Sequence, residues 1–132
     1  MEISDLEKRP FLGAAAWFKG SVVPIEKAMI PVNDWGLVHF DITYNVVPVR
    51  SGFFFRLHEY LDRFQASMTS LNVDPKMNQY RIRTTLLDLV SASGLKNSYV
   101  SMVYSRGVPE IPSTRDPRKC KNHFYAWCVP FI

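Results

Sequence analysis

Three side chains of different chemistry, His39, Tyr44 and Arg63, lie close together in the stretch that begins at Asp34. A guanidinium group stays charged and offers two parallel donors, so Arg63 could bind a phosphate dianion. Each residue also has an ordinary alternative. A tyrosine in a strand is usually part of the core, a lone histidine usually caps or faces solvent, and an arginine on a helix is usually a surface residue. The residues alone leave both interpretations open.

A predicted strand from Ile42 to Val49 would position Tyr44. A turn at Asp34-Trp35-Gly36 precedes this strand, and a second turn at Ser51-Gly52 follows it. Because side chains alternate between the faces of a strand, Tyr44 and Val46 are expected to share one face.

A predicted helix from about Leu57 to Asn72 would carry Arg63 on its polar flank. Its apolar residues are spaced as one stripe of an amphipathic helix: Leu57, Leu61, Phe64, Met68 and Leu71. A second helix is predicted to begin at Asp74-Pro75, because Asp is a good N-cap and Pro suits the first helical position. Gly94 is its predicted end.

Further strands are predicted on both sides of the helix pair, at Ala14 to Phe18, Val22 to Ile25, Tyr99 to Ser105 and His123 to Phe131. A long loop, Gly107 to Lys121, would connect the last two. This order predicts an α+β two-layer sandwich, in which a mainly antiparallel sheet is covered by two helices. Residues 1–132 are expected to form a single domain, with residues 1–12 as a loosely held N-terminal arm.

The composition excludes several classes of protein. Apolar residues make up 47% and charged residues 21%, as in globular proteins. The net charge of +4 is a weak argument for nucleic acid, and no RNP-like aromatic pattern supports it. The basic residues of one loop could be a solvated face or an edge that attracts anions: Arg115, Arg118, Lys119 and Lys121.

The remaining motifs point to a reduced, cytoplasmic setting. Cys120 and Cys128 have no C-x-x-C spacing, so a disulfide framework is not expected. No signal peptide and no apolar run of transmembrane length are apparent, so no membrane partner is predicted.

The histidines and cysteines lack zinc spacing, and neither G-x-S-x-G nor a P-loop occurs.

A family resemblance rests on residues 30–46, which read I-P-V-N-D-W-G-L-V-H-F-D-I-T-Y-N-V. This run resembles the N-terminal domain of class IV, fold type IV, pyridoxal-phosphate aminotransferases. It is most similar to the (R)-selective amine transaminases, which carry a D-x-G-x-x-H-x-D-x-T-Y string. The D-amino-acid and branched-chain aminotransferases share the frame, including R-L-x-x-H/Y-L-x-R, but differ in the H-x-D-x-T-Y part. The similarity covers the chain from about Ala15 to its end.

The resemblance implies pyridoxal 5'-phosphate as cofactor, a homodimer, and as substrates an amine or amino acid and a keto acid. Arg63, the last residue of R-L-H-E-Y-L-D-R, aligns with the family's ligand for the cofactor phosphate. Four further residues would line the substrate pocket by the same resemblance: His39, Tyr44, Val46 and Tyr99. For His39 the resemblance also allows a place at the dimer seam.

The loop from Gly107 to Lys121 implies a further contact. In related transaminases it reaches over the partner's active site, and some carry an arginine there that meets a substrate carboxylate. Here the matching segment is P-S-T-R-D, with Pro112 at that position and Arg115 nearby. This departure argues against recognition of a dicarboxylate or keto acid, but it does not exclude pyruvate.

No lysine of the chain matches the lysine that binds the cofactor covalently in the family. All are predicted in turns, loops, helix starts or the arm: Lys8, Lys19, Lys27, Lys76, Lys96, Lys119 and Lys121. The chain is therefore interpreted as a truncated aminotransferase without its C-terminal catalytic domain, and inactive alone. The alternative is a stand-alone, non-catalytic module that dimerises or binds an anion.

Overall fold

The computed structural model describes residues 13–74 and 76–131, so the arm predicted at residues 1–12 lies outside the described residues. The strands are β1 (Ala15–Phe18), β2 (Ser21–Pro24), β3 (Ile42–Arg50), β4 (Phe53–Phe54), β5 (Ser98–Pro109) and β6 (Cys120–Pro130). The helices are α2 (Trp35–Val38), α3 (Leu57–Leu71) and α4 (Gln79–Ser93), with short 3-10 turns η1 (Ile25–Lys27) and η2 (Pro117–Lys119). No helix among these residues is long and apolar enough to cross a membrane.

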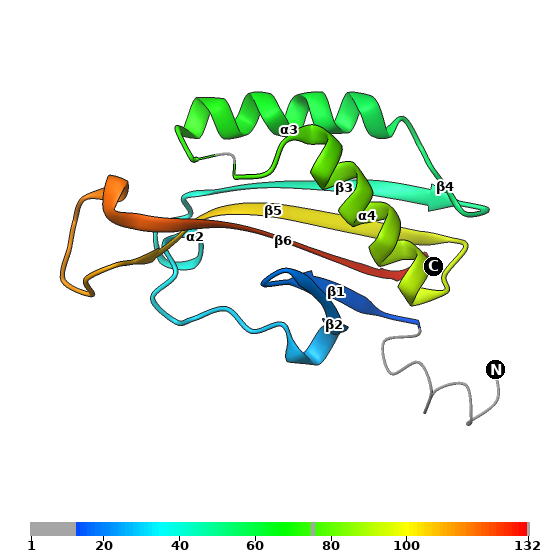
Figure 1. Ribbon diagram of the computed structural model, residues 1–132, viewed down its shortest axis with the longest axis horizontal. Coiled ribbons are helices and arrows are strands. Elements are labelled where there is room, and N and C mark those ends of the chain that lie inside the picture. The colour runs from blue at the N-terminus through cyan, green and yellow to red at the C-terminus, as the bar shows by residue number, and fades with distance from the viewer. Residues whose placement is uncertain (1–12, 75, 132) are drawn as a thin grey trace.

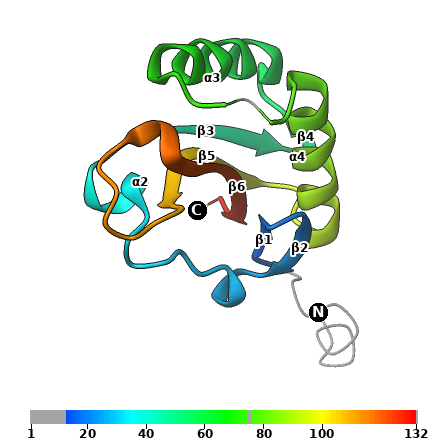
Figure 2. The same ribbon diagram turned by 60° about the vertical axis from the view of Figure 1, so that its left-hand side comes forward.

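The strands form one antiparallel sheet in the order β2-β1-β6-β5-β3-β4. Helices α3 and α4 cover one face of this sheet (Figure 1). Turning the molecule shows α2 and the segment that leads to it on the side away from α3 and α4 (Figure 2). The predicted two-layer α+β architecture is confirmed.

The core lies between the helix pair and the sheet because alternate strand residues face the helices. On the sheet these residues are Ala15, Val47, Val49, Val100, Met102, Tyr104, Phe124, Ala126 and Cys128. Helix α3 contributes Leu61, Phe64 and Met68 from the predicted stripe. Its predicted range is confirmed, with Asn72 as a left-handed C-cap at φ 55°.

Helix α4 begins later than predicted. Its N-cap is Asn78, whose side-chain oxygen accepts a hydrogen bond from the Arg81 amide at 2.8 Å. Asp74 does not cap the helix. Its amide donates a hydrogen bond to the side chain of Asn122 at 2.7 Å, and its carbonyl accepts one from the Tyr104 hydroxyl. These tertiary bonds hold Asp74 in a connecting turn. The predicted end at Gly94 is confirmed, with φ 71°.

Strands β5 and β6 extend further than predicted, so the loop between them is shorter than Gly107 to Lys121. The register of the two strands shifts between Ser105 and Val108, which marks a β-bulge. Gly107 fits this bulge with φ +86°, and a Cβ there would lie 1.7 Å from the carbonyl oxygen of Lys121. The glycine thus lets two backbones approach closely and extends the pairing to Pro109 and Cys120.

Candidate functional site

The face of the sheet opposite α3 and α4 carries three of the predicted pocket residues. Tyr44 pairs with Val103 and Val46 with Ser101, while Tyr99 pairs with Pro48. Residues opposite one another in a ladder point to the same face, so Tyr44, Val46 and Tyr99 share it. The predicted alternation of β3 placed Tyr44 and Val46 correctly.

Tyr44 is the open end of a row of aromatic rings on this face. Its side chain is 57% exposed. The Tyr44 ring stacks on Trp127, with ring centroids 6.3 Å apart and planes 26° apart. Trp127 in turn stacks on Tyr125 at 6.2 Å. Tyr99 lies further along β5 and packs against Phe131 at 4.6 Å.

His39 and Arg115 come together at a different place. Both line an open hollow of about 1120 Å³ between α2 and the loop that precedes η2. His39 is the C-cap of α2, and its ring meets Trp35 edge-on at 4.7 Å. The six predicted site residues therefore do not form one constellation within this chain.

Arg63 lies in the helix layer, on the exposed side of α3. Its guanidinium carbon lies 4.8 Å from the centroid of the Tyr60 ring. Within residues 13–74 and 76–131, no carboxylate oxygen lies within 4.0 Å of its side-chain nitrogens. An exposed guanidinium without a carboxylate partner is available to an anion.

A buried polar cluster that no sequence motif indicated in full anchors α2. The Asp34 side chain is buried and accepts hydrogen bonds from the Gly36 amide at 2.8 Å and the Ser105 hydroxyl at 2.5 Å. The His123 ring nitrogen lies 2.7 Å from its other oxygen. Burial alone would raise the pKa of Asp34, but the hydrogen bonds from His123, Ser105 and Gly36 outweigh burial and hold the pKa below 3.8.

Gly36 belongs to the same cluster through its lack of a side chain. A Cβ at this position would lie 2.2 Å from the Ser105 hydroxyl oxygen. The Asp34-Trp35-Gly36 motif predicted the turn. It could not identify Ser105 and His123, which lie 71 and 89 residues further along the chain than Asp34.

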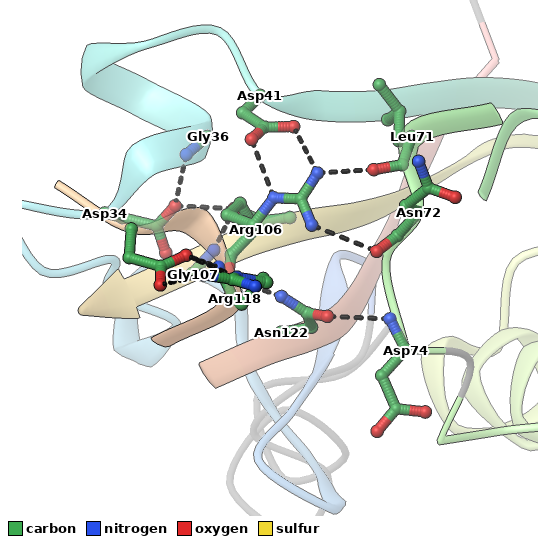
Figure 3. A network of polar contacts seen from close by, with 12 residues as sticks. Asp34, Gly36, Asp41, Leu71, Asn72, Asp74, Arg106, Gly107, Arg118 and Asn122 are labelled. Carbon is green, nitrogen blue, oxygen red and sulfur yellow. Dashed lines mark hydrogen bonds and ion pairs between the residues drawn. The ribbon is translucent and has the colours of Figure 1, made fainter. Parts of the chain in front are cut away.

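A second polar cluster, built on Arg106, lies next to the first (Figure 3). The Arg106 guanidinium donates to both carboxylate oxygens of Asp41, at 2.7 and 3.2 Å. It also donates to the carbonyl of Asn72 at 3.1 Å and to that of Leu71. One side chain thus joins the start of β3 to the end of α3. No sequence motif indicated this role.

The basic residues in and around η2 are all exposed. Arg118 pairs with Asp116 at 2.9 Å and remains 87% exposed. Lys121 lies in β6 rather than in the predicted loop, but its side chain is exposed. The other described lysines are also exposed: Lys19, Lys27, Lys76, Lys96 and Lys119. Among the described residues, no group of three His, Cys, Asp or Glu side chains could hold a metal ion.

No family model matches the chain. The chain is 29% identical over 115 residues to a provisionally named branched-chain-amino-acid aminotransferase of Methanocaldococcus jannaschii, covering 86% of this chain and 39% of that protein. It is 29% identical over 87 residues to a D-alanine aminotransferase of Listeria monocytogenes, covering 66% of this chain and 30% of that protein. The chain thus spans less than half the length of the curated relatives it matches.

Solved structures agree with this likeness. The branched-chain aminotransferase of Thermoproteus uzoniensis with norvaline superposes with a TM-score of 0.79 at 19% identity, over 89% of this chain and 41% of that chain. The fold is that of the N-terminal domain of fold type IV aminotransferases. The T.th. branched-chain enzyme complexed with N-(5'-phosphopyridoxyl)-L-glutamate has the same fold, with a TM-score of 0.78 at 16% identity over 89% of this chain and 40% of that chain. The aminotransferase likeness predicted from the sequence is confirmed at the level of fold.

Proposed function

We propose that this chain is the N-terminal, phosphate-binding part of a pyridoxal-phosphate-dependent transaminase. The whole protein would move an amino group between an amine or amino acid and a keto acid. The observation that carries the proposal is the Arg63 guanidinium, exposed and without a carboxylate partner among the described residues, on a fold shared with aminotransferases.

The residues present fit one end of the cofactor. Arg63 could hold the phosphate through two parallel donors, because a planar guanidinium matches phosphate geometry. The cofactor held there would supply an acceptor for the amino group and a sink for negative charge on the substrate carbon. The lysine that binds it covalently must be buried or otherwise lowered in pKa, and the described lysines are all exposed. We propose that this lysine belongs to a larger catalytic domain of a longer protein.

Tyr44 and Val46 would form one wall of the substrate pocket. They share a sheet face, and the exposed ring of Tyr44 leaves room for a small molecule beside it. Tyr99, further along the same face, would bound a small side-chain pocket. His39 and Arg115 line a separate hollow, so we propose that they act at the seam between two subunits of a homodimer.

We further propose amine donors and an (R) preference, as in the (R)-selective amine transaminases. The support is the string His39-Phe40-Asp41-Ile42-Thr43-Tyr44. The curated relatives bear the names of amino-acid aminotransferases, which supports amino-acid donors instead. The protein encoded by the full reading frame should be assayed with pyruvate and each enantiomer of a simple chiral amine, and in parallel with amino-acid donors. Activity with amino acids alone would refute the amine subtype and leave the transaminase proposal standing.

The phosphate role of Arg63 is testable on this chain. Inorganic phosphate should bind weakly near Arg63, and Arg63→Lys should weaken binding because an ammonium group lacks the two parallel donors. Arg81→Lys is the matched control, an exposed arginine at the start of α4. Equal phosphate affinity of the wild type and Arg63→Lys would refute the assignment.

The second candidate is a non-catalytic module that dimerises or binds an anion. Exposed apolar side chains on α2 and next to it favour this candidate: Val32 is 86%, Leu37 59% and Phe40 83% exposed. Reading the gene beyond Ile132 discriminates the two, because a continuing frame with a lysine in an apolar strand supports the transaminase.

Under either candidate this chain alone should not transaminate. Borohydride reduction with pyridoxal phosphate, followed by peptide mapping, should label no single lysine stoichiometrically, and labelling of one lysine together with turnover would contradict this.

The setting of the protein is proposed to be reduced and cytoplasmic. Cys120 and Cys128 are both free thiols, and burial raises the pKa of Cys128, which keeps that thiol protonated.

A further inference from the structure

We propose that Arg106 is a positioning residue that sets the relative placement of α3, which carries Arg63, and the start of β3, which leads to Tyr44. The proposal rests on the proposed function, because Arg63 and Tyr44 are there the phosphate and pocket residues. Among the described residues, neither Arg63 nor Tyr44 is a hydrogen-bond partner of Arg106. Its role would be to keep the two elements in one arrangement.

The contacts of Arg106 reach both elements at once. On one side its Nε and Nη2 atoms donate to the two oxygens of Asp41, the residue directly before β3. On the other side its Nη1 and Nη2 atoms donate to the carbonyls of Asn72 and Leu71, at the C-terminal end of α3. The side chains of Arg106 and Asp41 are only 11% and 21% exposed, so solvent screens this pair weakly.

The chemistry of both sides favours a cation at this position. The last carbonyls of a helix have no partner within the helix and carry the negative end of its dipole. A carboxylate lies on the opposite side of the same guanidinium. The flat, five-donor arginine can meet these four acceptors together, whereas a lysine offers three donors from a single point.

Arg106 lies within the β-bulge, and its backbone is bonded to residues on both sides of β5. Its amide donates to the Asp41 carbonyl at 3.0 Å, and its carbonyl accepts from the Asn122 side chain at 2.8 Å. On one side Ser105 is bonded to Asp34, and on the other Gly107 makes the close approach to β6. The backbone of Arg106 is therefore held in place by bonds that do not involve its side chain.

The first test measures amide hydrogen exchange in Arg106→Lys. The amides that should respond are those of Asp41, directly before β3, and Ile42, its first residue, and those of Asn72 and Val73 after α3. We expect exchange at both groups to accelerate together by about tenfold or more, because charge-assisted hydrogen bonds are lost. Faster exchange at one group only, or at neither, would overturn the proposal.

Arg118→Lys is the matched control for this experiment. Arg118 also pairs with an aspartate, but with Asp116 two residues away, and its side chain is 87% exposed. This variant should leave exchange at both junction groups unchanged. If Arg106→Lys fails to fold, Asp41→Asn provides a milder change, which removes one charge and keeps the shape. It should loosen the same two groups, and unchanged exchange there would count against the proposal equally.

The second test separates positioning from general stability. The affinity of Arg63 for inorganic phosphate should be measured by NMR at a temperature where every variant is folded. Arg106→Lys should weaken phosphate binding several-fold. Val100→Ala, a core substitution near the start of β5, should destabilise the fold and leave the affinity of the folded protein unchanged. Equal effects of the two variants would reduce Arg106 to a structural residue and refute its positioning role.

The two tests also distinguish this proposal from the proposed function. If the wild type binds no phosphate at Arg63, the phosphate anchor is refuted, and with it the functional consequence of Arg106. The exchange experiment still decides whether Arg106 links α3 to β3. If phosphate binds and only the exchange result fails, the phosphate anchor stands and the role of Arg106 is wrong.

Discussion

Gly36→Ala is expected to destabilise the protein, although helix propensity alone predicts the opposite. In a helix interior alanine is favoured over glycine by about 1 kcal/mol. Here the new Cβ would lie 2.2 Å from the Ser105 hydroxyl oxygen, 2.9 Å from a carboxylate oxygen of Asp34 and 3.1 Å from the end of Ile42. The methyl group can be accommodated only if Ser105 or the α2 turn moves.

The size of the effect follows from two costs. Inserting a methyl group into a packed site costs about 1 to 3 kcal/mol. Displacing the Ser105 hydroxyl also leaves the buried Asp34 carboxylate with one donor fewer, at about 1 to 3 kcal/mol. Together they amount to about 2 to 6 kcal/mol, which exceeds the propensity gain and is a large part of a typical domain stability of roughly 5 to 15 kcal/mol.

Urea unfolding of Gly36→Ala, Ser105→Ala and the double variant tests this reasoning. Ser105→Ala removes the atom with which the new methyl group collides. In that background Gly36→Ala should therefore cost at least about 1 kcal/mol less than in the wild type. Additive effects of the two substitutions, or a stabilising Gly36→Ala, would show that the predicted collision does not occur.

Three further outcomes are expected. Hydrogen bonds hold the pKa of Asp34 below 3.8 in the folded protein. The stability that the Asp34 carboxylate contributes should therefore be present above pH 3.8 and lost as the pH falls through the folded pKa. Acid unfolding of Asp34→Asn should lack this loss. Burial raises the pKa of Tyr104 above 10.0, so the free energy of unfolding should fall as the pH rises beyond 10.0. Tyr104→Phe should cost about 1 kcal/mol at neutral pH and abolish this pH dependence in urea titrations. The exposed side chains of Val32 and Phe40 should drive self-association, which sedimentation at increasing concentration would detect and a clean monomer would contradict.

Local patterns predicted those elements whose structure depends on local residues. The stripe of α3 and its end at Asn72 followed from the spacing of apolar residues and from the helical period. The alternation of β3 placed Tyr44 and Val46 on one face, because the strand period leaves no other choice.

Features that depend on distant partners were not predictable in this way. Asp74-Pro75 has good local signals for a helix start, yet Asn122 and Tyr104 bind the backbone of Asp74 and shift the start to Asn78. Partners of Asp34 and Asp41 lie on β5 and β6, and no local rule identifies them. The shared hollow of His39 and Arg115 likewise arises only when α2 packs near the loop before η2.

The strand order also determines when the sheet can be completed. The first hairpin, β1 and β2, joins the sheet only through β6, the last strand of the described chain. On a ribosome, β3, α3, α4 and β5 can meet while β6 is still being made, but β1 then has only β2 beside it. Contacts between such distant segments form slowly because a long loop must close first. Until β6 emerges, the edge of β5 and the apolar side of the first hairpin remain open to other chains, and this interval is when the protein is most prone to misassembly.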